Sequence, residues 1–272
     1  MSNFRENLPC LFTAFFPTKL KFCLAGAVDM FESDNTYRDR FKDKFDFAVV
    51  TIAKFGFTTR KLLSALFDVS AQGNWQFFKK LESSGLVSAN PVLGSRTKVY
   101  MLTKSGFEYA KYLLPSSNLV YRKTLSLPYL NHSLNIQQFV VEKREVIKSF
   151  LSESELIPMS LSRQPDLLAT MKNNQVIAIE MELTQKNAAR IQYNYASAFR
   201  DIERGFYHNV IYVFTDANVL RFYKSIYSQE VWNTYQIQVD KKLRQVGNFS
   251  PVELKQRYGD FIFNLQNPYK LG

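Results

Sequence analysis

The 272-residue sequence predicts a two-domain α+β protein with a helical first part and a second part built around strands. Apolar residues recur at helical spacing from residue 45 onward, which favours a cluster of helices. Short apolar runs bounded by turn signals dominate from about residue 156, which is typical of strands. Between the two patterns lies Pro-Ser-Ser-Asn at 115–118, a sequence that favours a linker.

Composition excludes a disordered chain and points to a polyanionic partner. Hydrophobic residues make up 46% of the chain, with only 10 Gly and 9 Pro, which indicates a folded core. A net charge of +11 and a pI near 9.5 favour nucleic acid. An anionic membrane is the rival, but no polybasic cluster adjoins an apolar run of the ~18 residues that a span needs. We therefore expect a cytoplasmic protein without a membrane partner, a leader or an anchor.

The first part predicts three helices, a two-stranded ribbon and a further helix over 45–115, after an N-terminal extension at 1–44. Gly56 ends the first helix, and Thr58-Thr59-Arg60 offers an N-cap to the second. Ser70 is expected to cap the third helix, 71–83, which would turn Trp75 and Phe78 inward. Cys10 and Cys23 lie in the extension without metal-ligand spacing, which favours free thiols in a reducing compartment and leaves one bridge open.

This order, with the runs FKKLESSGLV and YMLTKSGFEYA on either side of the ribbon, resembles a winged helix-turn-helix domain. The resemblance implies that the third helix enters the major groove while the wing reaches phosphates. Winged helices also serve as protein-interaction or dimerisation modules, and that alternative stays open. The side chains expected to contact DNA are Thr59, Arg60, Gln72, Asn74, Lys79, Lys80, Arg96, Lys98 and, on a later helix, Arg190.

After a linker at 116–127, the second domain is predicted over 128–245, with a C-terminal extension at 246–272. Its elements are expected in the order α-β-β-β-α-β-α-β. They are a helix capped by Asn131 or Ser133 that runs to about 149, a strand at 156–161, a hairpin at 167–182, a helix from Gln185 or Asn187 to 203, a strand at 210–214, a helix from Asp216 to 227 and a strand at 235–239.

Three carboxylates belong to the predicted hairpin. Side chains alternate along a strand, so Glu180 and Glu182 project on one face, and the hairpin can bring Asp166 alongside them. Converging carboxylates repel unless a hard divalent cation or a proton lies between them. This pattern favours a Mg²⁺ or Mn²⁺ site for phosphodiester chemistry. The alternative is a solvated strand face whose glutamates pair with Lys or Arg.

The expected order of helices and strands in the second domain, together with the three carboxylates, resembles the PD-(D/E)xK nuclease superfamily. The resemblance implies that Asp166 and Glu180 hold the metal and that a third polar residue orients the attacking water. Glu182 stands where a lysine is usual, although some members carry Glu there. Lys186 could instead fold its amine back over the site, so Glu182 and Lys186 both stay open for the third role.

Three further residues are candidates for the catalytic site. His132 and Glu142 lie on the helix that borders the catalytic sheet in this superfamily, and Tyr195 lies on the helix after the carboxylates. Each has a packing or capping role as its alternative. A Ser/His/Asp triad is not expected, since no G-x-S-x-G turn is present. A relaxase of the histidine-cluster type would need more than the two distant histidines of this chain.

The winged-helix pattern followed by NHSLNIQQF, PDLLATMKNNQVIAIEMELTQKN and RIQYNYASAF resembles the replication-relaxation family, over roughly residues 45–214. The resemblance implies a relaxase that nicks one DNA strand at a plasmid or mobile-element transfer or replication origin. Double-stranded origin DNA is the expected partner; a single-stranded product, an accessory mobilisation protein and a second copy stay open. Two alternatives also stay open: a non-catalytic DNA-binding initiator or regulator with a degenerate nuclease fold, and a double-strand endonuclease.

Overall fold

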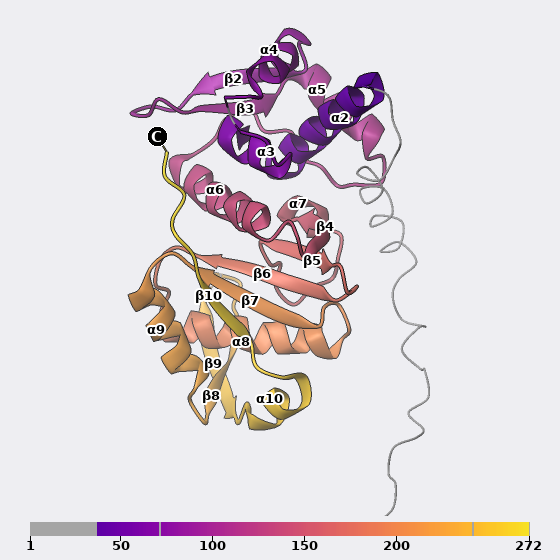
Figure 1. Ribbon diagram of the computed structural model, residues 1–272. Helices are drawn as coiled ribbons and strands as arrows, with labels where there is room; N and C mark the ends of the chain where they lie inside the picture. Colours follow the sequence, from indigo (N-terminus) through magenta and orange to yellow (C-terminus); the bar gives the residue numbers. More distant parts are fainter. Residues whose placement is uncertain (1–36, 71, 241, 272) are drawn as a thin grey trace, which may run out of the picture.

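A computed structural model describes residues 37–70, 72–240 and 242–271 of the chain. They form an α+β protein of two stacked parts, one mainly helical and one built on a five-stranded sheet (Figure 1). The predicted α+β class is therefore confirmed. Cys10, Cys23 and most of the expected N-terminal extension lie outside the described residues.

Within the described residues, the first part combines four helices with a small antiparallel sheet in the order β1-β3-β2. Its elements are α2 (Tyr37–Phe55), β1 (Thr58–Thr59), α3 (Arg60–Leu66), α4 (Trp75–Ser83), β2 (Val87–Pro91), β3 (Lys98–Leu102) and α5 (Lys104–Leu113). This is the predicted order of helices and ribbon. The expected boundary at residue 44 is wrong, because α2 continues through it.

The third predicted helix begins later than expected. Ser70 does not cap α4, since its Oγ accepts a hydrogen bond from the Gly73 amide at 3.0 Å within the preceding turn. Phe77 and Phe78 are buried, whereas Trp75 is 53% exposed, so its predicted inward position is wrong. Helical side chains lean toward the N-terminus of their helix. Trp75 is the first residue of α4, where more than half of its surface is open to solvent.

The second part is a sheet in the order β10-β7-β6-β5-β4, with helices on both faces. Its elements are α6 (Leu127–Glu142), β4 (Ile147–Ser152), α7 (Glu153–Leu156), β5 (Leu167–Met171), β6 (Val176–Glu182), α8 (Ala188–Glu203), β7 (Asn209–Phe214), α9 (Ala217–Tyr227), β8 (Trp232–Ile237), β9 (Leu243–Phe249), α10 (Val252–Tyr258) and β10 (Ile262–Leu265). Strands β4, β5 and β6 are antiparallel, and β6, β7 and β10 are parallel.

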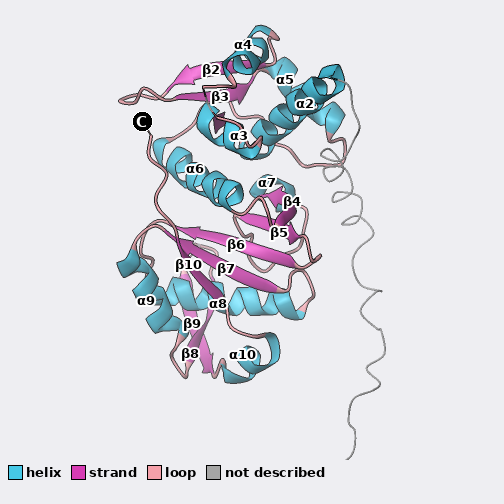
Figure 2. Ribbon diagram, viewed as in Figure 1, coloured by secondary structure: helices cyan, strands magenta, loops and turns pink. Residues whose placement is uncertain are grey.

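Helices lie on both faces of the sheet (Figure 2), and alternating residues of the central strands supply a separate core to each face. Ile177 and Ile179 pack with α6, while Ala178 packs with α8 and α9. The period of two along β6 therefore directs Glu180 and Glu182 to the α8 and α9 face, as the sequence predicts for a shared face. The hairpin itself is confirmed, with Asn174 in its turn at φ 63°.

Three boundaries in the second part differ from the predictions. Helix α6 begins four residues before Asn131, because Ser126 caps it by accepting a hydrogen bond from the Tyr129 amide at 3.4 Å and a proline occupies its first turn. It ends at Glu142; residues 143–146 form a turn, and residues 147–149, expected to continue the helix, belong to β4, which pairs with β5. No strand covers 156–161. The last predicted strand lies at 232–237, as β8.

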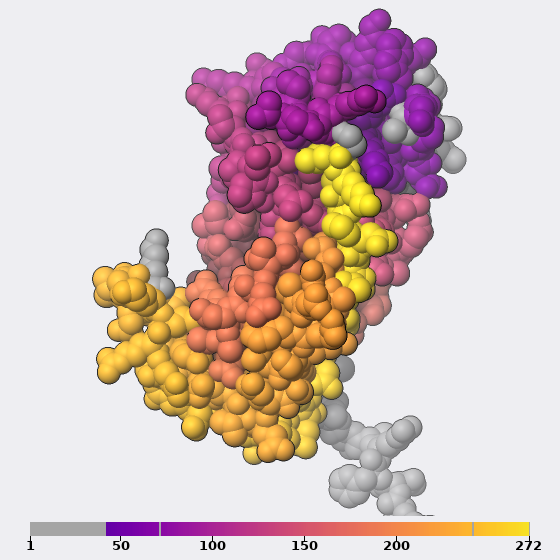
Figure 3. Space-filling model, turned by 90° about the vertical axis from the view of Figure 1, so that its left-hand side faces the viewer, coloured from indigo at the N-terminus to yellow at the C-terminus, as the bar shows by residue number. Residues whose placement is uncertain are grey.

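The residues predicted as a C-terminal extension are part of the fold. Strand β10 completes the sheet beside β7, and the chain then runs over the surface to the first part (Figure 3). There the Tyr269 amide donates to Asn135 Oδ1 at 2.8 Å, and its hydroxyl lies 2.9 Å from Thr59 Oγ1. This segment therefore joins the two parts through buried hydrogen bonds.

Candidate functional site

The predicted carboxylates gather where β5 begins and β6 ends. Leu167 pairs with Ile179 in the antiparallel register, which places Asp166 level with Glu180 on the neighbouring strand. Glu180 and Glu182 are both buried, with 5% and 1% of their surfaces exposed. The structure thus brings Asp166 and Glu180 side by side, with Glu182 one pleat further along.

Asp166 is held by the backbone of β6 and by α6. Its Oδ2 accepts a hydrogen bond from the Met181 amide at 2.7 Å and lies 3.4 Å from His132 Nε2. His132 Nε2 is also 3.2 Å from the Met181 carbonyl oxygen. Burial lowers the pKa of His132, but Asp166 outweighs it and holds that pKa above its usual value. Burial raises the pKa of Asp166, but His132 and the Met181 amide bring it below its usual value.

Glu180 forms an ion pair that the sequence analysis did not foresee. Arg163, in the loop before β5, donates from Nη1 to Glu180 Oε1, and only 20% of the arginine side chain is exposed. Glu180 Oε2 is buried without a hydrogen-bond partner. Burial raises the pKa of Glu180 to about 7, although Arg163 opposes the shift.

Two tyrosine hydroxyls add to this polar cluster. Tyr212 lies opposite Glu180 in the register of β6 with β7, and Tyr223 projects from α9. The Tyr212 hydroxyl is buried without a hydrogen-bond partner, whereas the buried Tyr223 hydroxyl interacts with the Glu182 carboxylate. Burial raises the pKa of Tyr212, and the charge of Glu180 raises it further. Burial also raises the pKa of Tyr223, and the neighbouring Glu182 carboxylate adds to that shift. Buried polar atoms are nearly always hydrogen-bonded, so unpartnered ones beside a carboxylate favour a bound polar species.

Glu182 has its own partner. Lys186 Nζ, four residues along the chain, lies 2.7 Å from Glu182 Oε1, as expected for a lysine folded back from the start of the next helix. Each carboxylate therefore faces a different basic side chain: His132, Arg163 or Lys186. Within the described ranges, no group of three or more His, Cys, Asp or Glu side chains is close enough to hold a metal ion.

Two candidate residues take no polar part in this cluster, although the Tyr195 ring packs against Tyr212 at a centroid distance of 5.2 Å. Tyr195 is fully buried among aromatic rings, and its hydroxyl donates to the Tyr223 carbonyl at 3.0 Å. It is a core residue that cannot reach a phosphate in this conformation. Glu142 is exposed and accepts from Gln138 at 2.7 Å. It follows His132 by ten residues on α6, about 15 Å along a helix.

The residues expected to contact DNA divide by exposure. Thr59 is wrong for this role, because it is 1% exposed and its Oγ1 caps α3 by accepting from the Leu62 amide at 3.3 Å. Arg60 is half-buried, with its guanidinium 5.5 Å from the Phe78 ring centroid, and Asn74 and Arg190 are also half-buried. The exposed members of the set are Gln72, Lys79, Lys80, Arg96 and Lys98.

Arg163, Tyr212 and Tyr223 belong to the cluster and were missed from sequence. Arg163 stands only three residues before Asp166, so nearness in the chain was an available signal. The tyrosines carried no local signal, because β7 and α9 reach the site only through the parallel pairing of β6 with β7 and the packing of α9.

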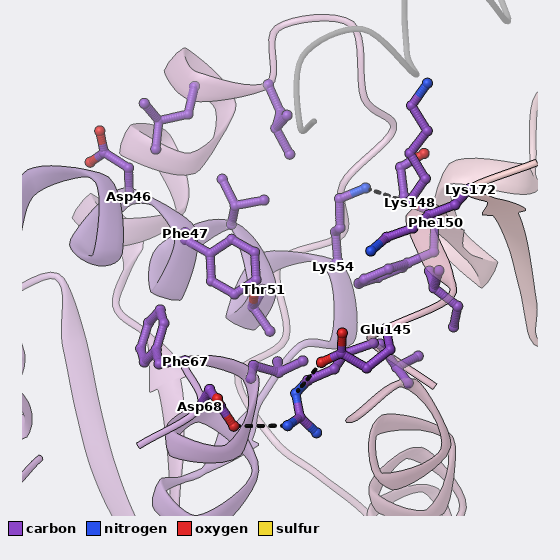
Figure 4. A pocket seen from close by; sticks show the side chains of 18 of the residues that line it. Asp46, Phe47, Thr51, Lys54, Phe67, Asp68, Glu145, Lys148, Phe150 and Lys172 are labelled. Carbon is purple, nitrogen blue, oxygen red and sulfur yellow. Dashed lines mark hydrogen bonds and ion pairs between the residues drawn. The ribbon is translucent and has the colours of Figure 1, made fainter. Parts of the chain in front are cut away.

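A separate groove of about 860 Å³ lies between the two parts (Figure 4). Phe47, Phe67 and Phe150 line it together with Lys148 and Lys172. None of the three carboxylates lines this groove, so its chemistry is independent of the candidate site.

No family model matches the chain, and neither a curated protein nor a solved structure matches it. The resemblance to the replication-relaxation family therefore stays a prediction. Among the described helices, none has both the length and the apolar character required to cross a bilayer.

Proposed function

We propose that the chain is a DNA-binding protein whose second part is a metal-dependent nuclease that nicks DNA. In this proposal the first part is a winged helix and the second has the PD-(D/E)xK arrangement. The order α6, β4, β5, β6, α8, β7 supports it, with an antiparallel meander followed by a parallel strand. An origin of transfer or replication is the proposed target, with the nicked strand as the product.

One observation carries the nuclease proposal: Asp166 lies level with Glu180, whose Oε2 is buried without a partner. Carboxylate oxygens are the ligands that Mg²⁺ and Mn²⁺ prefer. Asp166 and Glu180 would hold the cation, with Glu182 as the third candidate ligand. A bound cation would activate water and neutralise charge on the scissile phosphate.

The remaining groups of the cluster can act on their own. His132, whose side chain is 33% exposed and whose Nε2 lies 3.4 Å from Asp166 Oδ2, is placed to orient that carboxylate and to exchange a proton with solvent. Lys186, whose side chain is 34% exposed, can turn its amine from Glu182 toward a phosphate oxygen. In this proposal Glu182 or Lys186 supplies the third role.

DNA binding is proposed from charge and from the first part. The net charge of +11 favours a polyanion, and Arg96 and Lys98 are exposed on and beside the β2–β3 connection. If both contact phosphates, replacing either with alanine should weaken binding to all sequences alike. It should also reduce the slope of log affinity against log salt by about 1.

The Arg163–Glu180 pair favours a second candidate, a DNA-binding protein that has kept the fold without cleavage. The guanidinium occupies one oxygen of the carboxylate that should bind the cation. With His132 charged, the three carboxylates are balanced by three cations and need no further charge. For the nuclease, Arg163 must leave Glu180 when the cation binds.

Incubation of supercoiled plasmid with the protein and Mn²⁺ tests the nuclease proposal. Open circles are expected, with loss of nicking in Glu180→Gln and wild-type nicking in Glu142→Gln, a matched change at an exposed glutamate. Linear product would instead indicate a double-strand endonuclease. If the protein binds DNA but neither the wild type nor any variant nicks it, the result supports the second candidate, a DNA-binding protein without cleavage.

Cation binding gives an independent measurement, because the electron paramagnetic resonance signal of free Mn²⁺ reports the bound fraction without any cleavage. The nuclease proposal expects binding that Glu180→Gln removes. Arg163→Ala should strengthen it, because the competing guanidinium is gone. Equal and negligible binding by all three proteins contradicts the proposal.

A further inference from the structure

Trp75 is an exposed aromatic side chain at the start of α4 in the first part. The neighbouring aromatic residues Phe77 and Phe78 are at most 7% exposed, whereas Trp75 is 53% exposed at the start of α4. Single exposed aliphatic residues are common on protein surfaces. A half-exposed indole, however, offers a flat aromatic face on which another ring can stack.

A lysine accompanies this ring. Lys79 Nζ, one helical turn away, lies 5.3 Å from the Trp75 ring centroid, within the range of a cation–π contact. Lys79 is itself exposed, and the first turn of α4 contains no acidic residue. The surface thus presents an aromatic face and a positive charge together, without a carboxylate of that turn to repel an anion.

We infer that Trp75 contacts a nucleobase of bound DNA and that Lys79 contacts the adjoining phosphate. Proteins that bind nucleic acid combine aromatic stacking platforms with basic side chains in this way. This inference rests on the proposed DNA binding but is independent of cleavage. It names a contact for a residue that sequence patterning assigned to the core.

Two forms of DNA offer this chemistry. An unpaired base of a single strand can stack on the indole, and a duplex can present a thymine methyl group in the major groove. In both forms the ligand is a base beside a phosphate. Comparing a mixed-sequence single strand, its duplex and the duplex with deoxyuridine for thymidine separates the two sources.

The chain carries a built-in probe, because it has two tryptophans and Trp232 is 0% exposed. Trp75 should therefore dominate quenching by acrylamide. Bound DNA should quench its emission and protect it from acrylamide. Trp75→Phe should retain only the emission of Trp232, which DNA should leave unchanged.

Affinity is measured separately by the anisotropy of labelled DNA. Trp75→Ala should weaken binding about 5- to 100-fold, and Trp75→Phe should restore part of the loss because a smaller aromatic face remains. Tyr112→Ala is the matched control, since it removes a 78%-exposed aromatic residue of α5, and it should bind like wild type. Near-ultraviolet circular dichroism and thermal unfolding verify that each variant folds.

The outcomes distinguish this inference from the proposed function. A Trp75→Ala loss seen only with single strands identifies a stacked base. A loss seen only with the duplex, and reproduced by deoxyuridine, identifies a methyl contact. If wild type and Trp75→Ala bind all three DNAs equally and Trp75 emission does not change, the inference is overturned while DNA binding stands. If wild type binds none of them, the proposed DNA binding fails and the inference fails with it.

Discussion

Lys54 makes a buried ion pair that joins α2 of the first part to the second part. Its Nζ donates to the Phe150 carbonyl at 2.8 Å and lies 3.0 and 3.1 Å from the two carboxylate oxygens of Glu155. The side chains are only 7% and 3% exposed. Glu155 also accepts from the Ser152 amide and hydroxyl, both at 2.9 Å, which completes the capping box of α7.

Lys54→Met keeps the length of the side chain and removes its charge. The Glu155 carboxylate then keeps its two hydrogen bonds to Ser152 but loses its buried cation. Breaking a buried pair by removing one partner costs about 3–5 kcal/mol. The remaining hydrogen bonds place this case near the lower end, at about 3 kcal/mol. For a chain of this size the melting temperature should fall by about 6–12 °C.

Urea and thermal unfolding followed by circular dichroism measure this effect. Lys111→Met is the matched control, because Lys111 and its partner Glu108 are 52% and 61% exposed at 3.9 Å. Such a pair should contribute less than about 1 kcal/mol. The double variant Lys54→Met with Glu155→Leu should recover part of the lost stability, since neither charge is then buried alone, although Glu155→Leu also removes the two hydrogen bonds to Ser152. A Lys54→Met protein that unfolds like wild type would refute the reasoning.

Three further predictions concern the carboxylate cluster, the packing of α5 in the first part and the buried Tyr195. An NMR titration should give His132 a pKa above its usual value, and Asp166→Asn should lower that pKa. The stability that this pair contributes is fully present below the unfolded-state pKa of His132 and is lost as pH rises through the raised folded-state pKa. A His132 titration midpoint that Asp166→Asn leaves unchanged contradicts the pairing. Gly106→Ala should strongly destabilise the first part in urea, because a Cβ there would overlap the Leu86 carbonyl oxygen. Tyr195→Phe should cost about 1 kcal/mol and leave any DNA nicking intact; abolished nicking would instead indicate a covalent tyrosine intermediate.

The hairpin was predictable because its signals are local. Continuous apolar runs on either side of the Lys172-Asn173-Asn174 turn define β5 and β6, and the period of two along a strand fixes a common face for Glu180 and Glu182. Element boundaries near α6 were harder. The residues after Glu142 carry apolar side chains that suit either a helix or a strand, and their pairing with β5 decides between them.

The sequence by itself determined the order of most elements, the shared face of Glu180 and Glu182, and the net positive charge that points to a polyanionic partner. Only the tertiary structure decided that Arg163 pairs with Glu180, that Trp75 faces solvent and that β10 completes the sheet. The physical reason is the distance along the sequence over which each interaction acts. Periodicity and turn chemistry act between residues a few positions apart, whereas ion-pair partners, burial and sheet order depend on which distant segments pack together.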